Sequence, residues 1–252
     1  MDAIVGERLT SNDRIVDIYG FCGLSILSEY LPNGDIEQIV VPGDGFIKQE
    51  DLHDEDDVKP QNSLSVSAKL YLAIEMAESI AVLHEYPEGR IVHDDIQLSQ
   101  FLYDANGFVK FNDFNRAEIM LWNEEKQEFC RYRNGEGSGN YRAPEEYWDK
   151  PLDEKIDVYS FGNNIYTLLT GLWPFYEFND DRVEEMQAKL RNGETPFVDP
   201  RYRTRSFAEG KLVEIMEACW AYKSIDRPDM QTVTARLREV ADIVLGPERS
   251  GD

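Results

Sequence analysis

Two carboxylates and one amide stand at positions where a phosphoryl-transfer enzyme would need them. Asp95 and Asp113 lie 18 positions apart, each at the end of a short apolar run, and Gln100 follows Asp95 by five residues. Phosphoryl transfer requires an acid that accepts a hydroxyl proton, an acid that binds Mg²⁺ and a second metal ligand. The spacing therefore predicts Asp95 as the catalytic residue, with Asp113 and Gln100 as the metal ligands.

The composition favours a folded, acidic protein. The chain has 252 residues, of which 42% are hydrophobic and 12% aromatic, enough for a packed core in one large domain or two small ones. Its net charge of −23 comes from 26 basic and 49 acidic residues. Such a charge argues against nucleic acid or an anionic membrane as the main partner. No membrane insertion is expected, because the best apolar run, residues 15–27, is 13 residues long and contains Asp17.

The cysteines and the N-terminus indicate an intracellular protein. Cys22, Cys130 and Cys219 are odd in number, far apart and free of C-x-x-C spacing. We interpret them as reduced thiols in a cytoplasmic protein. The first residues lack signal-peptide character.

The apolar pattern divides the chain into a strand-containing start and a mostly helical body. Residues 14–20 and 24–31 are typical of two short strands, split by Cys22 and Gly23. Residues 41–64 are polar and acidic and predict a surface loop; a functional acidic contact is the alternative.

Four segments have apolar residues at helical spacing, and together they predict an α+β fold. They are residues 65–84, 153–171, 211–221 and 230–244. Gly171 and Gly246 are candidate helix stops. The carboxylates fall on irregular segments between helical blocks, where a rigid scaffold often positions catalytic groups.

The order of short motifs resembles the eukaryotic protein kinase domain over residues 7–244. In that family's signature a catalytic loop H-R-D-x-x-x-x-N precedes D-F-G and A-P-E. The matching residues here are His93, Asp94, Asp95 and Gln100; Asp113, Phe114 and Asn115; Ala143, Pro144 and Glu145; then Asp157, and Arg227 with Pro228. Residues 15–20 resemble the strand after the regulatory helix, and residues 28–34 resemble the gatekeeper and hinge. Residues 137–145 look more like the tyrosine-kinase-like and Ser/Thr branch than like true tyrosine kinases.

This resemblance implies a kinase-like α+β fold, with a mostly helical C-terminal lobe and an incomplete N-terminal β lobe. Residues 1–40 would be the N-lobe remnant and hinge, 41–64 an acidic loop insertion, 65–245 the C-lobe and 246–252 a tail. The small lobe should be loosely ordered, because it has no Gly-rich phosphate loop and no V-A-I-K strand.

The resemblance also assigns roles. ATP and Mg²⁺ would be the cofactors. The acceptor would be a Ser or Thr hydroxyl of a protein, with Tyr as the less expected acceptor. The backbone of Glu29 and Leu31 would bind adenine, Asp113 and Gln100 would hold Mg²⁺, and Asp95 would orient and deprotonate the hydroxyl. Structural roles are implied for three further features: His93 beside the D-F-G Phe, Asp157 hydrogen-bonded to the catalytic loop, and Glu145 paired with Arg227.

Several positions depart from the family pattern and leave a second function open. Asp94 replaces the Arg that would clamp a phosphorylated activation loop, and an acid there cannot pair with phosphate. Gln97 replaces a Lys, Gln100 an Asn and Asn115 a Gly. The alternative is a pseudokinase-like protein-interaction module with little or no catalytic activity. A longer chain with the missing strands upstream is the third possibility, and the sequence leaves the oligomeric state open.

Overall fold

The computed structural model describes residues 1–23, 25–42, 60–135, 137–178 and 182–246, and it confirms the predicted α+β class. The helices are α1 (Asp2–Leu9), α2 (Glu37–Val40), α3 (Val66–His84), α4 (Lys155–Thr170), α5 (Val183–Arg191), α6 (Tyr202–Arg205), α7 (Phe207–Cys219) and α8 (Met230–Leu245). Residues 43–59 of the predicted acidic loop and residues 247–252 of the predicted tail lie outside the described residues.

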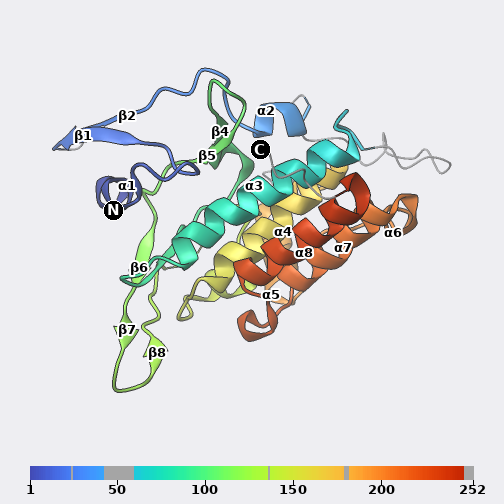
Figure 1. Ribbon diagram of the computed structural model, residues 1–252. Coiled ribbons are helices and arrows are strands. Elements are labelled where there is room, and N and C mark those ends of the chain that lie inside the picture. Colours follow the sequence, from blue (N-terminus) through green and yellow to red (C-terminus); the bar gives the residue numbers. More distant parts are fainter. Residues whose placement is uncertain (24, 43–59, 136, 179–181, 247–252) are drawn as a thin grey trace.

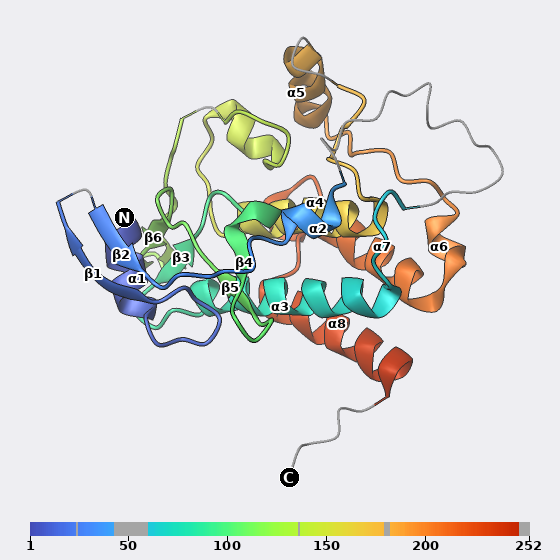
Figure 2. The same ribbon diagram turned by 90° about the horizontal axis from the view of Figure 1, so that it is seen from above.

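Four long helices form the body of the molecule. Figures 1 and 2 show α3, α4, α7 and α8 lying side by side, with α3 against α8 and α4 against α7. Every residue from 156 to 170 of α4 is buried, so this helix is the centre of the core. Burial of apolar surface on this scale is the main stabilising contribution to a fold.

Local sequence signals explain where these helices begin and end. The Ser65 hydroxyl accepts a hydrogen bond from the Ala68 N–H at 3.2 Å, and Asp229 caps α8 through the Thr232 N–H at 2.7 Å. Gly171 ends α4 with a left-handed φ of 75°, which glycine adopts without a steric penalty. The predicted helix at 211–221 begins four residues too late, because Ser206 caps α7 at residue 207. Helices α5 and α6 were not predicted.

Three-residue strands position the two chemically important loops. β3 (Arg90–Val92) pairs antiparallel with β6 (Glu118–Met120), and β4 (Phe101–Tyr103) pairs with β5 (Val109–Phe111). The loop at 93–100 therefore lies between β3 and β4, and the loop at 112–115 between β5 and β6. A further small pair, β7 (Trp122–Asn123) with β8 (Glu128–Phe129), extends away from the body (Figure 1).

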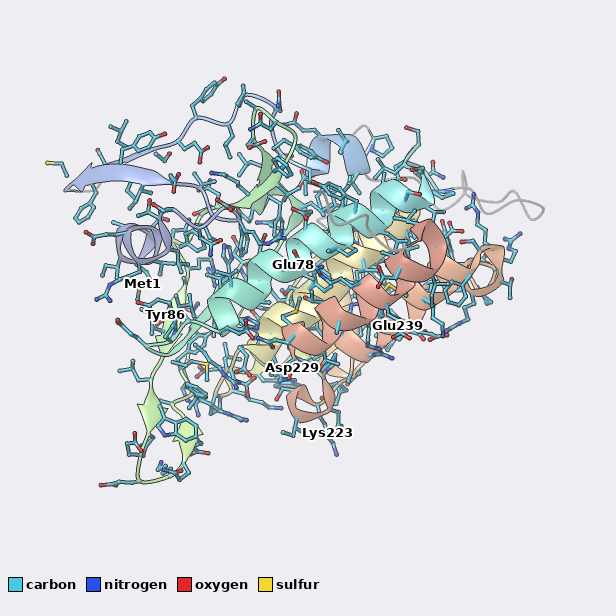
Figure 3. All side chains as sticks on the ribbon, viewed as in Figure 1. Met1, Glu78, Tyr86, Lys223, Asp229 and Glu239 are labelled. Atoms are coloured by element: carbon cyan, nitrogen blue, oxygen red, sulfur yellow. The ribbon has the colours of Figure 1, made fainter. Side chains whose placement is uncertain are left out.

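The N-terminal part consists of α1 and a two-stranded antiparallel sheet. The two predicted strands are present with shifted bounds: β1 (Ile18–Cys22) pairs with β2 (Ser25–Ser28) as a hairpin, and Cys22 is the last residue of β1 instead of part of the connection. Both strands are largely exposed. The preceding segment joins the body through a bridge between Ile15 and Phe111. Arg8 of α1 donates to the Tyr86 hydroxyl at 3.3 Å, just beyond the end of α3 that Figure 3 marks with the Tyr86 label.

Candidate functional site

The buried carboxylate of Asp157 holds the loop at 93–100 in place. Its Oδ2 accepts from the His93 backbone N–H at 2.7 Å, and its Oδ1 accepts from the Asp94 N–H at 3.0 Å. His84 Nε2 lies 3.0 Å from the same Oδ2. The side chain of Asp157 is 1% exposed, so these bonds form in a low-dielectric interior, where they are strong. The predicted support of the catalytic loop by Asp157 is confirmed.

Asp95 and Gln100 meet on this loop. The Gln100 amide donates to Asp95 Oδ2 at 3.4 Å, and the Gln97 amide donates to the same oxygen at 3.3 Å. Asp95 Oδ1 lies 3.4 Å from Arg142 Nη2. The side chain of Asp95 is 25% exposed, so it reaches solvent while its charge is partly compensated.

Gln100 and Asp113 line one cavity of about 250 Å³, which also includes Asp2 and Ser28. Its apolar wall comes from Val16 and from the β1 and β2 side chains of Ile18 and Ile26. The cavity therefore lies between the N-terminal hairpin and the two loops. Its volume is below the roughly 300–1,000 Å³ usual for a drug-sized ligand, so it is too small to enclose a whole nucleotide.

The loop that carries Asp113 is fixed by aromatic packing and by α1. His93 stacks on Phe111 at 4.3 Å between ring centroids and contacts the edge of Phe114 at 5.5 Å. This arrangement confirms the predicted structural role of His93 beside that Phe. The Phe114 backbone N–H donates to Asp2 Oδ1 at 3.0 Å. Asp113 has a φ of 63°, a left-handed conformation that Asp and Asn adopt more readily than most residues.

The predicted adenine-binding residues lie at the end of the hairpin. The Glu29 N–H donates to the Asp17 carbonyl at 2.8 Å, and the Glu29 carboxylate accepts from Lys110 Nζ at 2.7 Å. Leu31 is 9% exposed and belongs to the core. The lining of the 250 Å³ cavity includes neither Glu29 nor Leu31. The predicted contact of Glu29 and Leu31 with adenine stays a prediction.

Asp94, on the loop at 93–100, is the centre of a charged cluster. Its carboxylate is 1% exposed and contacts Arg116, Arg142 and the Asn134 amide. Burial raises the pKa of Asp94, while the two guanidinium groups and the amide lower it. The cluster joins the catalytic loop to the segment between Asp113 and Glu145.

A buried ion pair anchors the end of that segment. Arg227 Nη1 and Nη2 donate to Glu145 at 2.6 and 2.8 Å, a bidentate pair. The guanidinium also donates to the carbonyls of Lys155, Ala221 and Tyr222. The predicted structural pair between Glu145 and Arg227 is confirmed.

Comparison with known proteins identifies the family. The family model for protein tyrosine and serine/threonine kinases matches residues 4–237, and the chain belongs to this family. Three Arabidopsis thaliana proteins illustrate the similarity: serine/threonine-protein kinase 12 (26% identical, covering 86% of this chain and 41% of the relative), serine/threonine-protein kinase STY46 (26%, covering 93% and 36%) and receptor-like protein kinase 5 (30%, covering 89% and 21%). The chain thus spans less than half the length of these curated relatives.

Sequence reasoning missed two groups at the site. Asp2 lies at the start of α1, and its carboxylate accepts a hydrogen bond from the Phe114 N–H of the loop at 112–115. Arg142 precedes the A-P-E motif directly, and that adjacency was the available signal. Both contacts link distant parts of the chain, so spacing alone could not reveal them.

The donor set agrees with the preferences of Mg²⁺. Because the Gln100 NH₂ group is engaged with Asp95, its carbonyl oxygen is the atom that would ligate a metal in the cavity that Asp113 also lines. Mg²⁺ is commonly bound by one or two carboxylates together with substrate phosphates. Among the described residues, no group of three His, Cys, Asp or Glu side chains converges on a closed metal cage.

Every helix in the described part of the chain is too short or too polar to cross a bilayer.

Proposed function

We propose that this protein binds Mg-ATP and transfers the γ-phosphoryl group to a Ser or Thr hydroxyl of a protein substrate. The observation that carries the proposal is the hydrogen bond from Gln100 to Asp95 on a loop held by Asp157, together with the cavity that Gln100 and Asp113 both line. The similarity to proteins named serine/threonine kinases supports Ser or Thr as the acceptor.

The residues divide the work as follows. Asp95 orients the acceptor hydroxyl and takes its proton, a contribution of about 10²–10⁴-fold in rate for a well-placed base. Asp113 and the Gln100 carbonyl would hold Mg²⁺, which supplies charge neutralisation for the phosphates when bound. The backbone at Glu29 and Leu31 would receive the adenine. We keep the cytoplasmic location as a prediction.

The charge of the cavity makes nucleotide binding dependent on the metal. The cavity is lined by two acidic residues, Asp2 and Asp113, and its described lining contains no Lys or Arg. A polyphosphate entering alone would meet two carboxylates and no cation. We therefore expect ATP to bind only together with a divalent ion.

Thermal unfolding with and without Mg-ATP tests nucleotide binding. Millimolar Mg-ATP should raise the melting temperature, ATP with a chelator should not, and Asp113→Asn should abolish the shift. Asn keeps the left-handed backbone accessible, so this variant removes only the charge. Asp149→Asn is the matched control, because Asp149 also has a positive φ, 46°, and lies outside the cavity.

Phosphoryl transfer is tested separately with labelled ATP and a peptide library that contains Ser, Thr and Tyr. Asp95→Asn should reduce transfer by at least about 100-fold while the Mg-ATP shift persists. Phosphoamino-acid analysis then identifies the acceptor. If wild type shows neither a shift nor transfer, the proposal is wrong, and partner binding unaffected by Asp95→Asn would favour the interaction module.

A further inference from the structure

Opposite charges join the catalytic loop to the segment that follows Asp113. Asp94 Oδ2 lies 3.4 Å from Arg116 Nη2 and also accepts from the Asn134 amide. Asp94 Oδ1 lies 3.4 Å from Arg142 Nη1. All three donors come from the segment between Asp113 and Glu145. We call these four residues the Asp94 clamp.

Arg142 makes the most contacts in the clamp. Its Nη1 donates to the Asp94 carbonyl at 2.9 Å and to Glu146 Oε1 at 3.0 Å. Its Nε donates to the Ser138 carbonyl at 2.9 Å, and its Nη2 reaches Asp95. The side chain is 13% exposed. One guanidinium therefore connects the catalytic loop, the Ser138 carbonyl four residues before Arg142, and the start of the 3-10 helix Pro144–Trp148.

Gly137 provides the space for this arginine. A Cβ atom at residue 137 would lie 2.7 Å from Arg142 Cδ, closer than real carbon contacts allow. The clash involves the middle of the arginine side chain, so a larger residue would displace the guanidinium from its partners. A change at Gly137 can thus disturb the clamp while every charge stays in place.

We propose that the Asp94 clamp holds this segment against the catalytic loop without any phosphate, and that a negative charge added at Ser138 releases it. The sign of the charges carries the argument. A buried carboxylate at residue 94 attracts the two arginines directly and repels an added anion. Phosphorylation can therefore only compete with Asp94 for Arg142.

Ser138 is the hydroxyl residue placed to compete. The Tyr141 hydroxyl is hydrogen-bonded to Thr167 at 2.8 Å, and Tyr132 is half-buried. Ser138 is exposed, and its carbonyl already accepts from Arg142. An anionic group on the Ser138 side chain would thus form within reach of the same guanidinium.

Hydrogen exchange of the backbone amides in residues 137–146 tests the clamp. Asp94→Asn removes the charge but keeps a residue that tolerates the observed φ of 61°. This variant and Arg142→Gln should each speed exchange about 10- to 100-fold, the cost of losing a hydrogen bond to a charged group. The double variant should exchange no faster than the quicker single variant, because both changes break the same contacts. Arg133→Gln, in the same segment but 57% exposed, should stay within about 2-fold of wild type.

Two further variants keep the test informative if a clamp substitution unfolds the protein. Gly137→Ala should also speed exchange, and Ser138→Asp should speed it relative to the uncharged Ser138→Asn. The proposal is overturned if Asp94→Asn behaves like Arg133→Gln, or if Ser138→Asp slows exchange.

This inference concerns the segment that the proposed phosphoryl transfer would use, yet its readout does not require transfer. The clamp residues lie outside the lining of the 250 Å³ cavity, so Asp94→Asn should keep the Mg-ATP shift of wild type. If wild type shows neither an Mg-ATP shift nor phosphoryl transfer, the proposed function fails, while the exchange data still decide on the clamp.

Discussion

The four long helices and the N-terminal hairpin bury their apolar side chains to very different extents. In α4 every residue from 156 to 170 is buried, whereas Tyr19, Phe21 and Leu27 of the hairpin are 68%, 53% and 65% exposed. An isolated two-stranded sheet is at best marginally stable in water. We therefore expect the hairpin to depend on a few contacts with the body, and the body to unfold independently of the hairpin.

This difference has a consequence for the proposed chemistry. Asp95 and Gln100 lie on a loop that Asp157 of the body holds, whereas the cavity that Gln100 and Asp113 line takes part of its apolar wall from Ile18 and Ile26 of the hairpin. Catalytic geometry and nucleotide affinity should thus respond to different substitutions. The predictions below test this separation, from the largest expected effect to the smallest.

Removing the buried arginine of the body should cause the largest loss. Arg227→Met leaves the Glu145 carboxylate without its bidentate partner, which typically costs about 3–5 kcal/mol. Urea unfolding followed by circular dichroism measures the loss. Arg203→Met is the control, because Arg203 pairs with Glu217 at the surface and should change stability by less than about 1 kcal/mol. If the two variants lose equal free energy of unfolding, water reaches the Glu145–Arg227 pair and the pair contributes no more than a surface pair.

The buried Lys69 should make the free energy of unfolding of the body depend on pH. Its Nζ donates to the Leu169 carbonyl at 2.9 Å, and burial lowers its pKa from 10.5 to about 8. Between these values the unfolded chain binds more protons than the folded chain, so this group makes stability rise with pH. The stability of wild type relative to Lys69→Met should therefore increase between pH 8 and 10.5, by at most about 3 kcal/mol.

The Lys69 comparison needs an exposed lysine as its control. Lys211→Met serves, because Lys211 is 40% exposed and forms a surface pair with Glu214. Urea unfolding of the three proteins across this pH range should give a flat difference for Lys211→Met and a rising one for Lys69→Met. A flat difference for both would contradict the lowered pKa.

The long helices of the body were easier to predict from the sequence than the short elements around them. Helices α3, α4 and α8 were predicted because apolar spacing agrees with local caps such as Ser65 and Gly171. Helix α5 was missed because it is short and buries only Met186 and Leu190. Strands β3 and β6 pair with each other across a long stretch of sequence, which a local pattern does not encode, and β4 and β5 form a local hairpin of only three residues a strand, too short for a clear alternation.

The candidate site was predictable where its residues are close in sequence. Asp95 and Gln100 share one loop, and the motif spacing associated Asp113 with them. The partners of Asp94 could not be predicted, because Arg116, Asn134 and Arg142 come from 22 to 48 positions away. The sequence shows only an acid where the family has an arginine.

A small change at the junction should loosen the hairpin alone. Ile15 is fully buried and bridges to Phe111, so Ile15→Val removes one methylene at the junction, at a cost of about 0.5–1.5 kcal/mol. Hydrogen exchange in residues 15–23 should become about 2- to 10-fold faster, while the urea midpoint of the body stays unchanged. Ile80→Val, the same change in buried α3, should instead lower the midpoint. A midpoint lowered equally by both variants would show that hairpin and body unfold as one unit.

The smallest effect is expected on the exposed face of the hairpin. Leu27 lies in β2 and is 65% exposed, so Leu27→Ser should change the free energy of unfolding by less than about 0.5 kcal/mol. Leu72→Ser is the matched control in α3, where the side chain is 2% exposed and the loss should exceed about 2 kcal/mol. Urea unfolding at two protein concentrations measures both. A loss above about 1 kcal/mol for Leu27→Ser that grows with concentration would mean that a second copy covers this face in solution, because only bound surface makes stability depend on concentration.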